Sequence, residues 1–594
     1  MNRESKKCQN CHDEFWIEPD DFVFYKKMDV PPPTFCPECR LVRRMSVRNE
    51  RSLYKDICDL CGKQFISMYS PNENFKVYCR ECWYSDKWDA LSYSKKYDFS
   101  KPFFEQFRQL TESVPHIGIV YIHENFNCDY ANYVADSKNV YLSQSIIAKS
   151  EDVYYSKNID SSKEIFDCLA LKDSEKCYWN LDGSKNYQCR FILKSRECIN
   201  SDFLFDCVNC QNCFLGSNLR NKRFVIRNKQ YSKENYFAEV SKINFGQKSE
   251  IDKLNLEFLN LVEKSLHKFG NLTKTINCTG DNLENCKNVL WSFDTYNAEN
   301  LKFCSRSPRM QDSYDLYGGA DGELLYEAIY SGYRSYNSQF FYFGEVTINS
   351  QYVNECLGNS SHLFACVGLR NKQYCILNKQ YTKEEYEELV PKIIEHMNEM
   401  PYVDKQGRVY KYGEFFPPEL SPFTYNETIA QEYFPLTKEQ VIEQGYQWKD
   451  PETRNYQIDI MSENLPDNIK DVDDSIIGKV IECAHNGECN EQCTEAFKII
   501  KEELQFYKKM NLPLPRLCPN CRHYGRLKQR NPLKLWNRKC QCSGGKSDNG
   551  VYQNTAKHKD HPEDQPCPNE FETSYIPERP EIVYCEACYQ AEVV

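Results

Sequence analysis

The chain has 594 residues, of which 32 are cysteine, and it carries a formal net charge of −11. Hydrophobic residues make up 41% and aromatic residues 14% of the sequence, which excludes an intrinsically disordered chain and allows several buried cores. No run of about 18 apolar residues is present and the charged start contains no apolar stretch, so we expect neither a membrane span nor a secretory signal. We therefore expect a cytoplasmic protein without a membrane partner, whose cysteines are thiols or metal ligands rather than disulfides.

Four cysteine pairs, each with two intervening residues, occupy segment 1-92. A C-x2-C turn places two thiolates on one side of a tight loop, and two such turns supply the four sulfurs of a tetrahedral zinc ion. The simplest pairing joins the first pair to the second and the third to the fourth, and an interleaved pairing stays open. Since a closed four-cysteine site has no free position for a substrate, we interpret these sites as structural. The predicted ligands are Cys8, Cys11, Cys36, Cys39, Cys58, Cys61, Cys79 and Cys82.

The C-terminal end is a copy of this module. The sequence FYKKM that begins at Phe24 recurs 482 positions later at Phe506, and after a net insertion the match resumes with Cys79 on Cys585, 506 positions apart. The first and third cysteine pairs of this copy have irregular spacing. We expect about four Zn2+ ions per chain as cofactors. The predicted ligands in the second copy are Cys489, Cys493, Cys518, Cys521, Cys540, Cys542, Cys585 and Cys588.

The insertion in the C-terminal copy contains further residue types that bind zinc. Two histidines separated by two residues precede a cysteine within it. Two interpretations stay open, a further metal site or ordinary loop residues. The residues concerned are His558, His561 and Cys567.

Basic residues concentrate between the second and third cysteine pairs of each copy. The arginines common to both copies are spaced by four, which aligns them along one face of a helix. Such a strip is a candidate contact for a phosphate backbone. The alternative is a solvated face, or one that pairs with the acidic middle of the same chain. The candidate nucleic-acid contacts are Arg40, Arg44, Arg48, Arg522, Arg526 and Arg530.

Short units recur about every 12 positions in the middle of the chain. They begin with serine and continue with β-prone residues, as in SKNVY from Ser137, SEDVY from Ser150 and SKEIF from Ser162. This period suits a strand and a turn, so we expect a parallel β-solenoid in which two or three units form one coil.

Cysteines also recur within these units. We interpret them as small apolar residues that fill the interior of the solenoid. A metal site is the alternative, and the cluster of Cys207, Cys210 and Cys213 is where it most needs testing.

A second copy of the repeat region follows 150 residues after the first. The sequence NKQY that begins at Asn228 recurs at Asn378, and Ser232 and Thr382 follow as predicted helix N-caps. Each half of the solenoid is therefore predicted to end in a capping helix, which protects its open edge. We interpret the NKQY boxes as the exit from each half, and the alternative is a ligand site.

The predicted fold is mainly β. A central parallel β-solenoid-like repeat region in two duplicated halves with capping helices is flanked by two double zinc-ribbon modules. The expected segments are a double zinc-ribbon module at 1-92, a helical connector at 93-125, the first solenoid half at 126-245, a helix at 246-270, the second half at 271-400, an extended connector at 401-478 and a double zinc-ribbon module at 479-594.

Several motifs occur together in this chain. They are FYKKM followed by P-x-P and CP-x-CR at both ends, RNERSLYK from Arg48, YCRECWYSDKW from Tyr78 and the repeated NKQY box. With them, most of the chain resembles an uncharacterised family of cysteine-rich multi-zinc-ribbon proteins of small-genome bacteria. The resemblance implies the same domain organisation and supplies no activity or catalytic residue.

Three classes of function are compatible with the sequence. The first is a non-enzymatic zinc-binding scaffold that contacts nucleic acid or a ribonucleoprotein through the arginine strips. The second is a protein-interaction scaffold without nucleic acid. The third, a β-solenoid enzyme, requires carboxylates clustered on one face, whereas the acidic residues here are scattered among the turns. The sequence therefore favours a binding protein over an enzyme.

Overall fold

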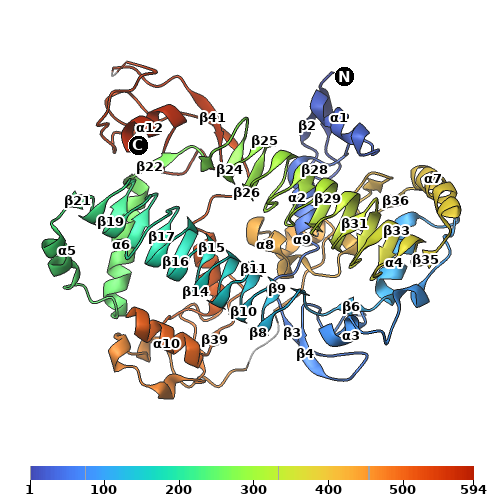
Figure 1. Cartoon of the computed structure of the whole chain (residues 1–594), viewed down its shortest axis with the longest axis horizontal. Helices are drawn as coiled ribbons and strands as arrows, with labels where there is room; N and C mark the ends of the chain where they lie inside the picture. The colour runs from blue at the N-terminus through green and yellow to red at the C-terminus, as the bar shows by residue number, and fades with distance from the viewer. Residues whose placement is uncertain (1, 74, 332, 452–454, 563) are drawn as a thin grey trace. The chain divides into compact units, whose positions relative to one another are not determined.

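The computed structural model describes residues 2–73, 75–331, 333–451, 455–562 and 564–594. The polypeptide is mainly β and separates into two compact units, each built from segments that are distant in sequence (Figure 1). Each unit combines one cysteine-rich module with the solenoid that is farther from it in the sequence. Unit 1 consists of Met1–Val120, Gly270–Asp450 and Leu533–Leu535, and unit 2 of Tyr121–Phe269, Pro451–Pro532 and Trp536–Val594.

The solenoid of unit 2 is a stack of short, mainly parallel strands. Residues paired on neighbouring strands are mostly 12 positions apart, as are Ile165 and Cys177, and then Cys177 and Cys189. Its strands are β7 (Tyr121–Ile122), β8 (Phe126–Asp129), β9 (Asn132–Ala135), β10 (Lys138–Tyr141), β11 (Gln144–Ile147), β12 (Glu151–Tyr154), β13 (Lys157–Asp160), β14 (Lys163–Phe166), β15 (Leu169–Lys172), β16 (Glu175–Ser184), β17 (Tyr187–Leu193), β18 (Asp202–Phe205), β19 (Gln211–Ser217), β20 (Arg223–Ile226) and β21 (Lys229–Gln230).

The solenoid of unit 1 repeats this arrangement. Its register is the same, since Leu301 pairs with Ser313. Its strands are β23 (Leu272–Thr273), β24 (Gly280–Glu284), β25 (Lys287–Leu290), β26 (Ser292–Tyr296), β27 (Glu299–Lys302), β28 (Gln311–Leu316), β29 (Glu323–Ser331), β30 (Tyr336–Gly344), β31 (Thr347–Ile348), β32 (Gln351–Asn354), β33 (Ser360–Val367), β34 (Gln373–Ile376) and β35 (Lys379–Gln380).

One repeat unit forms a complete coil. Left-handed backbone conformations recur at every third residue, for example at Asp173, Lys176, Trp179 and Asp182, with φ between 48° and 55°. Each of these residues turns the chain through a corner, so the coil closes after four short sides. The prediction of a parallel solenoid is confirmed, but the expectation that two or three units share a coil is wrong, because the corners come three residues apart.

The serines that begin the repeat units lie inside the coils. The Ser162 hydroxyl donates to the Asp160 carbonyl at 2.7 Å and accepts the main-chain N–H of Ser174 at 3.1 Å. Successive serines thus satisfy backbone groups at a corner, which buried main chain requires.

Cysteines occupy comparable interior positions. Cys177 and Cys189 are fully buried and donate their thiols to main-chain carbonyls. Cys207, Cys210 and Cys213 belong to the same core and donate in the same way. The predicted interior packing of these cysteines is therefore confirmed.

Each solenoid ends in a hairpin and a helix, as predicted. The NKQY boxes contain β21 and β35, which pair antiparallel with the preceding β20 and β34. The helices α5 (Lys233–Val240) and α7 (Lys383–Glu399) begin directly afterwards. Ser232 and Thr382 cap these helices by accepting main-chain N–H groups. Both boxes therefore have a structural role.

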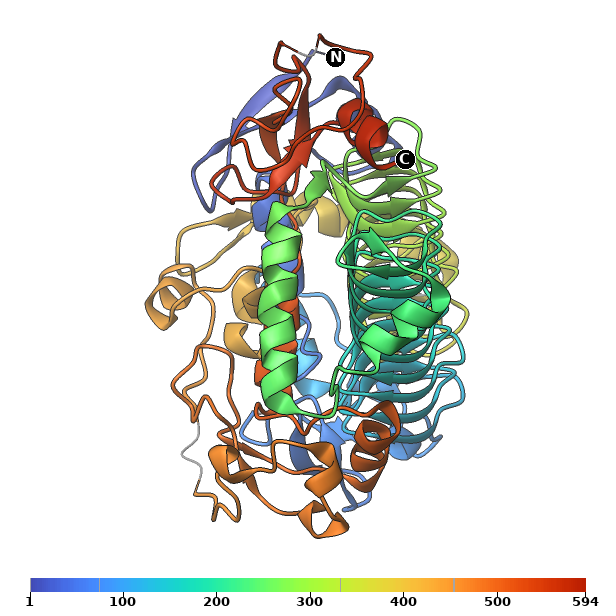
Figure 2. The same cartoon turned by 90° about the vertical axis from the view of Figure 1, so that its left-hand side faces the viewer.

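Two further helices adjoin the solenoids. In unit 2, α6 (Lys248–Lys264), the long green helix of Figure 2, lies against β18 and β19. The Phe258 ring of this helix packs edge-on against Phe203. In unit 1, α4 (Phe103–Ser113) lies against β33. Within the described ranges, no helix combines the length and apolar character that a bilayer crossing needs.

The two cysteine-rich modules have the same element order, which agrees with a duplication. In both, a strand pair precedes two helices, and a second strand pair precedes a strand and a helix. Unit 1 has β1 (Glu4–Lys7), β2 (Glu14–Ile17), α1 (Pro19–Lys27), α2 (Pro37–Met45), β3 (Tyr54–Ile57), β4 (Gln64–Ser67), β5 (Val77–Tyr78) and α3 (Arg80–Trp83). Unit 2 has β38 (Ile481–Glu482), β39 (Ala496–Phe497), α10 (Lys501–Met510), α11 (Pro519–Leu527), β40 (Trp536–Lys539), β41 (Glu570–Thr573), β42 (Ile582–Tyr584) and α12 (Glu586–Val593).

The segment expected to be an extended connector is more structured than the sequence indicates. It contains the strand pair β36 (Tyr402–Val403) and β37 (Val409–Tyr410) and the short helices α8 (Ile429–Tyr433) and α9 (Lys438–Glu443). The adjacent rings of Phe415 and Phe416 are fully buried in the core of unit 1. Burial of aromatic residues therefore anchors a stretch whose prolines favour irregular structure.

Candidate metal centres

The module cysteines gather in four groups of four. Within each group the sulfur atoms lie within 4.8 Å of one another. Cys11 and Cys36 have sulfurs 3.7 Å apart, and Cys61 and Cys79 have sulfurs 3.9 Å apart, close to the edge of about 3.8 Å expected for a tetrahedron with metal–sulfur bonds of about 2.3 Å. The groups are Cys8, Cys11, Cys36 and Cys39; Cys58, Cys61, Cys79 and Cys82; Cys483, Cys493, Cys518 and Cys521; and Cys540, Cys567, Cys585 and Cys588.

In unit 1 the two groups contain the eight predicted cysteines. The first cysteine pair joins the second and the third joins the fourth, which is the simplest pairing predicted from the sequence. Unit 2 differs at its first site, where Cys483 rather than Cys489 completes the group. Cys483 directly follows β38 as Cys8 follows β1, so it is the structural counterpart of Cys8. Cys489 lies in the longer loop between the two ligand positions, with its sulfur 3.6 Å from that of Cys521.

The second site of unit 2 also differs from the prediction, because Cys567 takes the place assigned to Cys542. Cys567 lies 506 positions after Cys61, which is the offset of the whole C-terminal part of the module. The strands β40 and β41 that flank the insertion pair as β3 and β4 do. The signal that identifies Cys567 was therefore present in the repeat offset.

All four groups share one hydrogen bond between their two halves. The first cysteine of the second pair donates its main-chain N–H to the sulfur of the first cysteine of the group. Such donors favour the charged thiolate over the thiol, which a metal ligand requires. The donor and acceptor residues are Cys36 to Cys8 at 3.3 Å, Cys79 to Cys58 at 3.3 Å, Cys518 to Cys483 at 3.2 Å and Cys585 to Cys540 at 3.2 Å.

One thiol in each group has a lowered pKa. Hydrogen bonds from Cys36 and Cys39 hold the pKa of Cys8 far below its usual range. Burial raises the pKa of Cys58, but main-chain N–H donors outweigh it and lower that pKa to about 7. Hydrogen bonds from neighbouring thiols likewise lower the pKa of Cys518 and Cys585. Each group thus favours an ionised sulfur.

The first cysteine group of each module positions the arginine-bearing helix. Cys36 is the N-cap of α2, with its sulfur accepting the main-chain N–H of Cys39, and Cys518 caps α11 in the same way. A thiolate at this end of a helix is also favoured by the helix dipole. Each of these cysteine pairs therefore fixes the start of the helix whose next turns carry the arginines.

The arginines predicted to contact nucleic acid are buried, and this corrects the predicted basic surface. Arg40 and Arg44 both pair with Asp315 of the unit 1 solenoid, at 2.9 Å and 3.1 Å. Burial with a carboxylate leaves no guanidinium face for a phosphate backbone. The exposed fractions are 1% for Arg40, 0% for Arg44, 2% for Arg48, 2% for Arg522, 0% for Arg526 and 7% for Arg530.

Unit 2 uses its arginines in the same way. Arg522 and Arg526 each lie 2.5 Å from an oxygen of Asp167, and Arg530 pairs with Asp182 at 2.8 Å. The alternative interpretation, in which the strips pair with acidic residues of the same chain, therefore describes this structure. The acidic partners of these three arginines, Asp167 and Asp182, are solenoid residues that the sequence analysis did not identify.

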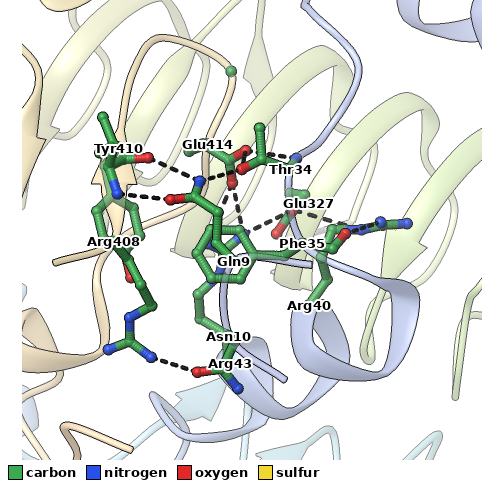
Figure 3. A network of polar contacts seen from close by, with 12 residues as sticks. Gln9, Asn10, Thr34, Phe35, Arg40, Arg43, Glu327, Arg408, Tyr410 and Glu414 are labelled. Atoms are coloured by element: carbon green, nitrogen blue, oxygen red, sulfur yellow. Dashed lines mark hydrogen bonds and ion pairs between the residues drawn. The ribbon is translucent and has the colours of Figure 1, made fainter. Parts of the chain in front are cut away.

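A further arginine joins three segments of unit 1. Arg43 lies 3.1 Å from Glu327 and 3.4 Å from Glu414, and Glu414 also accepts the main-chain N–H of Thr34 (Figure 3). The buried Arg43 guanidinium packs over the Phe35 ring at 4.3 Å. This network binds the module, the solenoid and the 401–450 segment together.

The same segment also holds the first cysteine pair. Gln9 accepts the main-chain N–H of Val409 at 2.8 Å and donates to the Val409 carbonyl at 3.1 Å (Figure 3). Arg408 donates to Asn10, the second of the two residues between Cys8 and Cys11, at 2.5 Å. The loop that carries Cys8 and Cys11 is thus held from outside the module.

His558 and His561 come together, but not with Cys567. Their ring nitrogens lie 3.2 Å apart, and the nearest sulfurs are those of Cys542 and Cys588. Of the residues predicted for a further metal site, Cys567 instead belongs to the adjoining four-cysteine group.

The sequence matches no protein-family model and no curated protein.

Proposed function

We propose that this protein is a non-enzymatic, zinc-stabilised scaffold in which four Zn2+ ions fasten two cysteine-rich modules to two β-solenoids. The observation that carries the proposal is the link between each first metal group and the solenoid of the same unit. Cys36 and Cys518 cap helices whose arginines are buried against Asp315 and Asp167.

Zinc is favoured over other metals by the donor set. Four cysteine sulfurs in a closed tetrahedral arrangement are typical of structural zinc and leave no coordination position for a substrate. The strands of the modules are only two to four residues long, and small elements of this kind commonly need a metal for stability. The proposed metal ligation of the module cysteines fits a reducing, cytoplasmic location, where thiols and thiolates persist rather than disulfides.

The partner we propose is another protein. Leu256 and Leu259 on one side of α6 are 65% and 51% exposed, and exposed apolar side chains are more typical of protein-binding surfaces than of surfaces that bind nucleic acid. The six arginines that made nucleic acid a candidate are paired within the chain.

The test is metal analysis of the full chain together with the ratio of absorbance at 260 and 280 nm. We expect at least four Zn2+ per chain, no salt-released nucleic acid, and loss of the α2 and α11 protection from hydrogen exchange after chelation. Fewer than three Zn2+ per chain, or unchanged protection after complete zinc removal, would overturn the structural role. Nucleic acid that salt releases would overturn the choice of partner.

A further inference from the structure

Four side chains from the 24-residue insertion and from α12 converge beside the last four-cysteine group. The Nδ1 atom of His558 lies 3.2 Å from the sulfur of Cys542 and 3.2 Å from Nε2 of His561, which lies 3.3 Å from the sulfur of Cys588. Around a tetrahedral zinc ion with two nitrogen and two sulfur ligands, such separations are about 3.3 to 3.6 Å. The donor atoms therefore have the spacing of a metal site.

The outer ring nitrogens show which atoms are available as ligands. Nε2 of His558 lies 2.9 Å from the Glu592 carboxylate, and Nδ1 of His561 lies 3.0 Å from the Gln565 carbonyl. Both outer nitrogens therefore carry the proton, and the inner nitrogens present lone pairs to each other. Two lone pairs at 3.2 Å repel one another unless a cation lies between them.

The surroundings support the same assignment. Glu592 lies one helical turn after Cys588 on α12 and also accepts the main-chain N–H groups of Thr555 and Ala556 at 2.8 Å and 3.1 Å. A buried carboxylate that orients a histidine is the usual outer partner of a metal ligand. Asn554 donates to the sulfur of Cys542 at 3.1 Å, which favours its thiolate form.

We propose that these residues bind a fifth metal ion and that Cys588 bridges it to the ion of the four-cysteine group. This inference rests on the zinc binding proposed for that group. Cys588 belongs to both sets of converging donors. The two ions together would have five thiolates and two neutral imidazoles as ligands, so the site with a shared Cys588 would carry a net charge of −1.

The corresponding site of unit 1 is an internal control. Its Cys58 and Cys61 are separated by two residues, so no insertion supplies additional donors there. The two copies therefore differ in nuclearity: one ion at the unit 1 site and two at the unit 2 site.

The test uses the full chain and zinc or cobalt as the only added metal. We expect five Zn2+ per wild-type chain and four in the double variant His558→Gln/His561→Gln, with His123→Ala as a control that keeps five. In the Co2+-loaded protein, a thiolate bridge couples two of the ions, so the wild type gives an electron paramagnetic resonance signal weaker than five isolated ions and the double variant restores uncoupled intensity.

Four Zn2+ in both wild type and double variant, with no magnetic coupling in the cobalt protein, would overturn the bridged pair and leave the proposed scaffold intact. Fewer than three in the wild type would overturn the scaffold as well. If the double variant misfolds, the stoichiometry and coupling of the wild-type cobalt protein decide the question alone.

Discussion

The two units bury the same arginine helix against a solenoid but surround it differently. In unit 1, Arg43 of α2 faces Glu327, which lies one coil beyond Asp315. The residue 482 positions later is Gly525, and Trp179, one coil beyond the equivalent Asp167, approaches it. A buried ion pair in one copy thus corresponds to a glycine and an indole in the other, an exchange that similar buried volumes allow.

A second pair of equivalent residues, His116 and His267, differs in the direction of the pKa shift. His116 of unit 1 lies 3.1 Å from Glu355, whereas His267 of unit 2 packs against Phe205, 150 positions before Glu355. Burial opposes protonation of both rings, but the Glu355 carboxylate outweighs it and raises the pKa of His116. Burial and the charge of Lys194 lower the pKa of His267 to about 3. Duplication therefore preserved the backbone and let the buried electrostatics diverge.

The largest effect is expected from breaking the metal groups that the copies share. Cys36→Ser and Cys518→Ser each remove a ligand and a helix cap. Structural metal sites contribute about 10 kcal/mol or more at neutral pH, which is comparable with the whole stability of a domain. We expect one metal fewer per chain and loss of hydrogen-exchange protection in α2 or α11, measured by mass spectrometry.

Cys177→Ser is the matched control, because it makes the same chemical change at a buried cysteine of the solenoid core. It should keep the metal content of the wild type. If either ligand variant retains full metal content and helix protection, its cysteine is not a ligand.

The next largest effect tests the divergent arginine environments. Asp167→Asn leaves Arg526 beside Trp179, whereas after Asp315→Asn the Glu327 carboxylate remains 3.4 Å from Arg44. Removing one partner of a buried ion pair costs about 3–5 kcal/mol. We expect that cost in unit 2 and a smaller one in unit 1, measured as the free energy of opening of α11 and α2. Equal destabilisation of the two units would show that Glu327 does not compensate for the lost Asp315 carboxylate.

The histidine pair predicts opposite responses to pH. The folded pKa of His267 is about 3, below the unfolded value of about 6.5, so the unfolded chain binds more protons in acid. The contribution of His267 is complete above pH of about 6.5 and is lost as pH falls towards 3, by about 1.4 kcal/mol per pH unit. His116 has a raised folded pKa, so its contribution is present below pH of about 6.5 and is lost as pH rises through the folded value.

Phe205→Glu should make the pKa of His267 in unit 2 more like that of His116 in unit 1. A carboxylate beside His267 is expected to raise its pKa, as followed by the NMR signals of the imidazole ring. Glu355→Gln is the reverse change and should lower the pKa of His116. Unchanged titration in both variants would assign the difference to burial alone.

Periodicity in the sequence was sufficient to predict the solenoid, because each coil repeats the same polar and apolar positions. It did not reveal that one unit closes a coil, since the left-handed corners at residues such as Trp179 and Asp182 have no glycine to mark them. Capping helices were predictable because Ser232 and Thr382 act locally.

The metal groups were predictable where spacing is local and only in part where it is not. The two-residue spacing identified all eight cysteines of the two unit 1 groups, and the repeat offset contained Cys567. Cys483 was not predicted as a member of its group, because the loop that follows it is longer than the loop that follows its counterpart Cys8. The arginine partners were beyond sequence reasoning, because Arg40 and Asp315 are 275 positions apart and charge spacing alone does not distinguish a surface from an interface.

The smallest predicted effect concerns Gly525, which lies at the position equivalent to Arg43. A Cβ added at Gly525 would lie 3.9 Å from the ring of Trp179, an ordinary contact, and the residue lies within α11. Alanine in a helix is favoured over glycine by about 0.5–1 kcal/mol. Gly525→Ala should therefore stabilise α11 by that amount, measured as the free energy of its opening by hydrogen exchange. Destabilisation would mean that Trp179 requires the space of a missing side chain, and the exchange of Arg43 and Glu327 for Gly525 and Trp179 would then be a coupled change in packing rather than two independent substitutions.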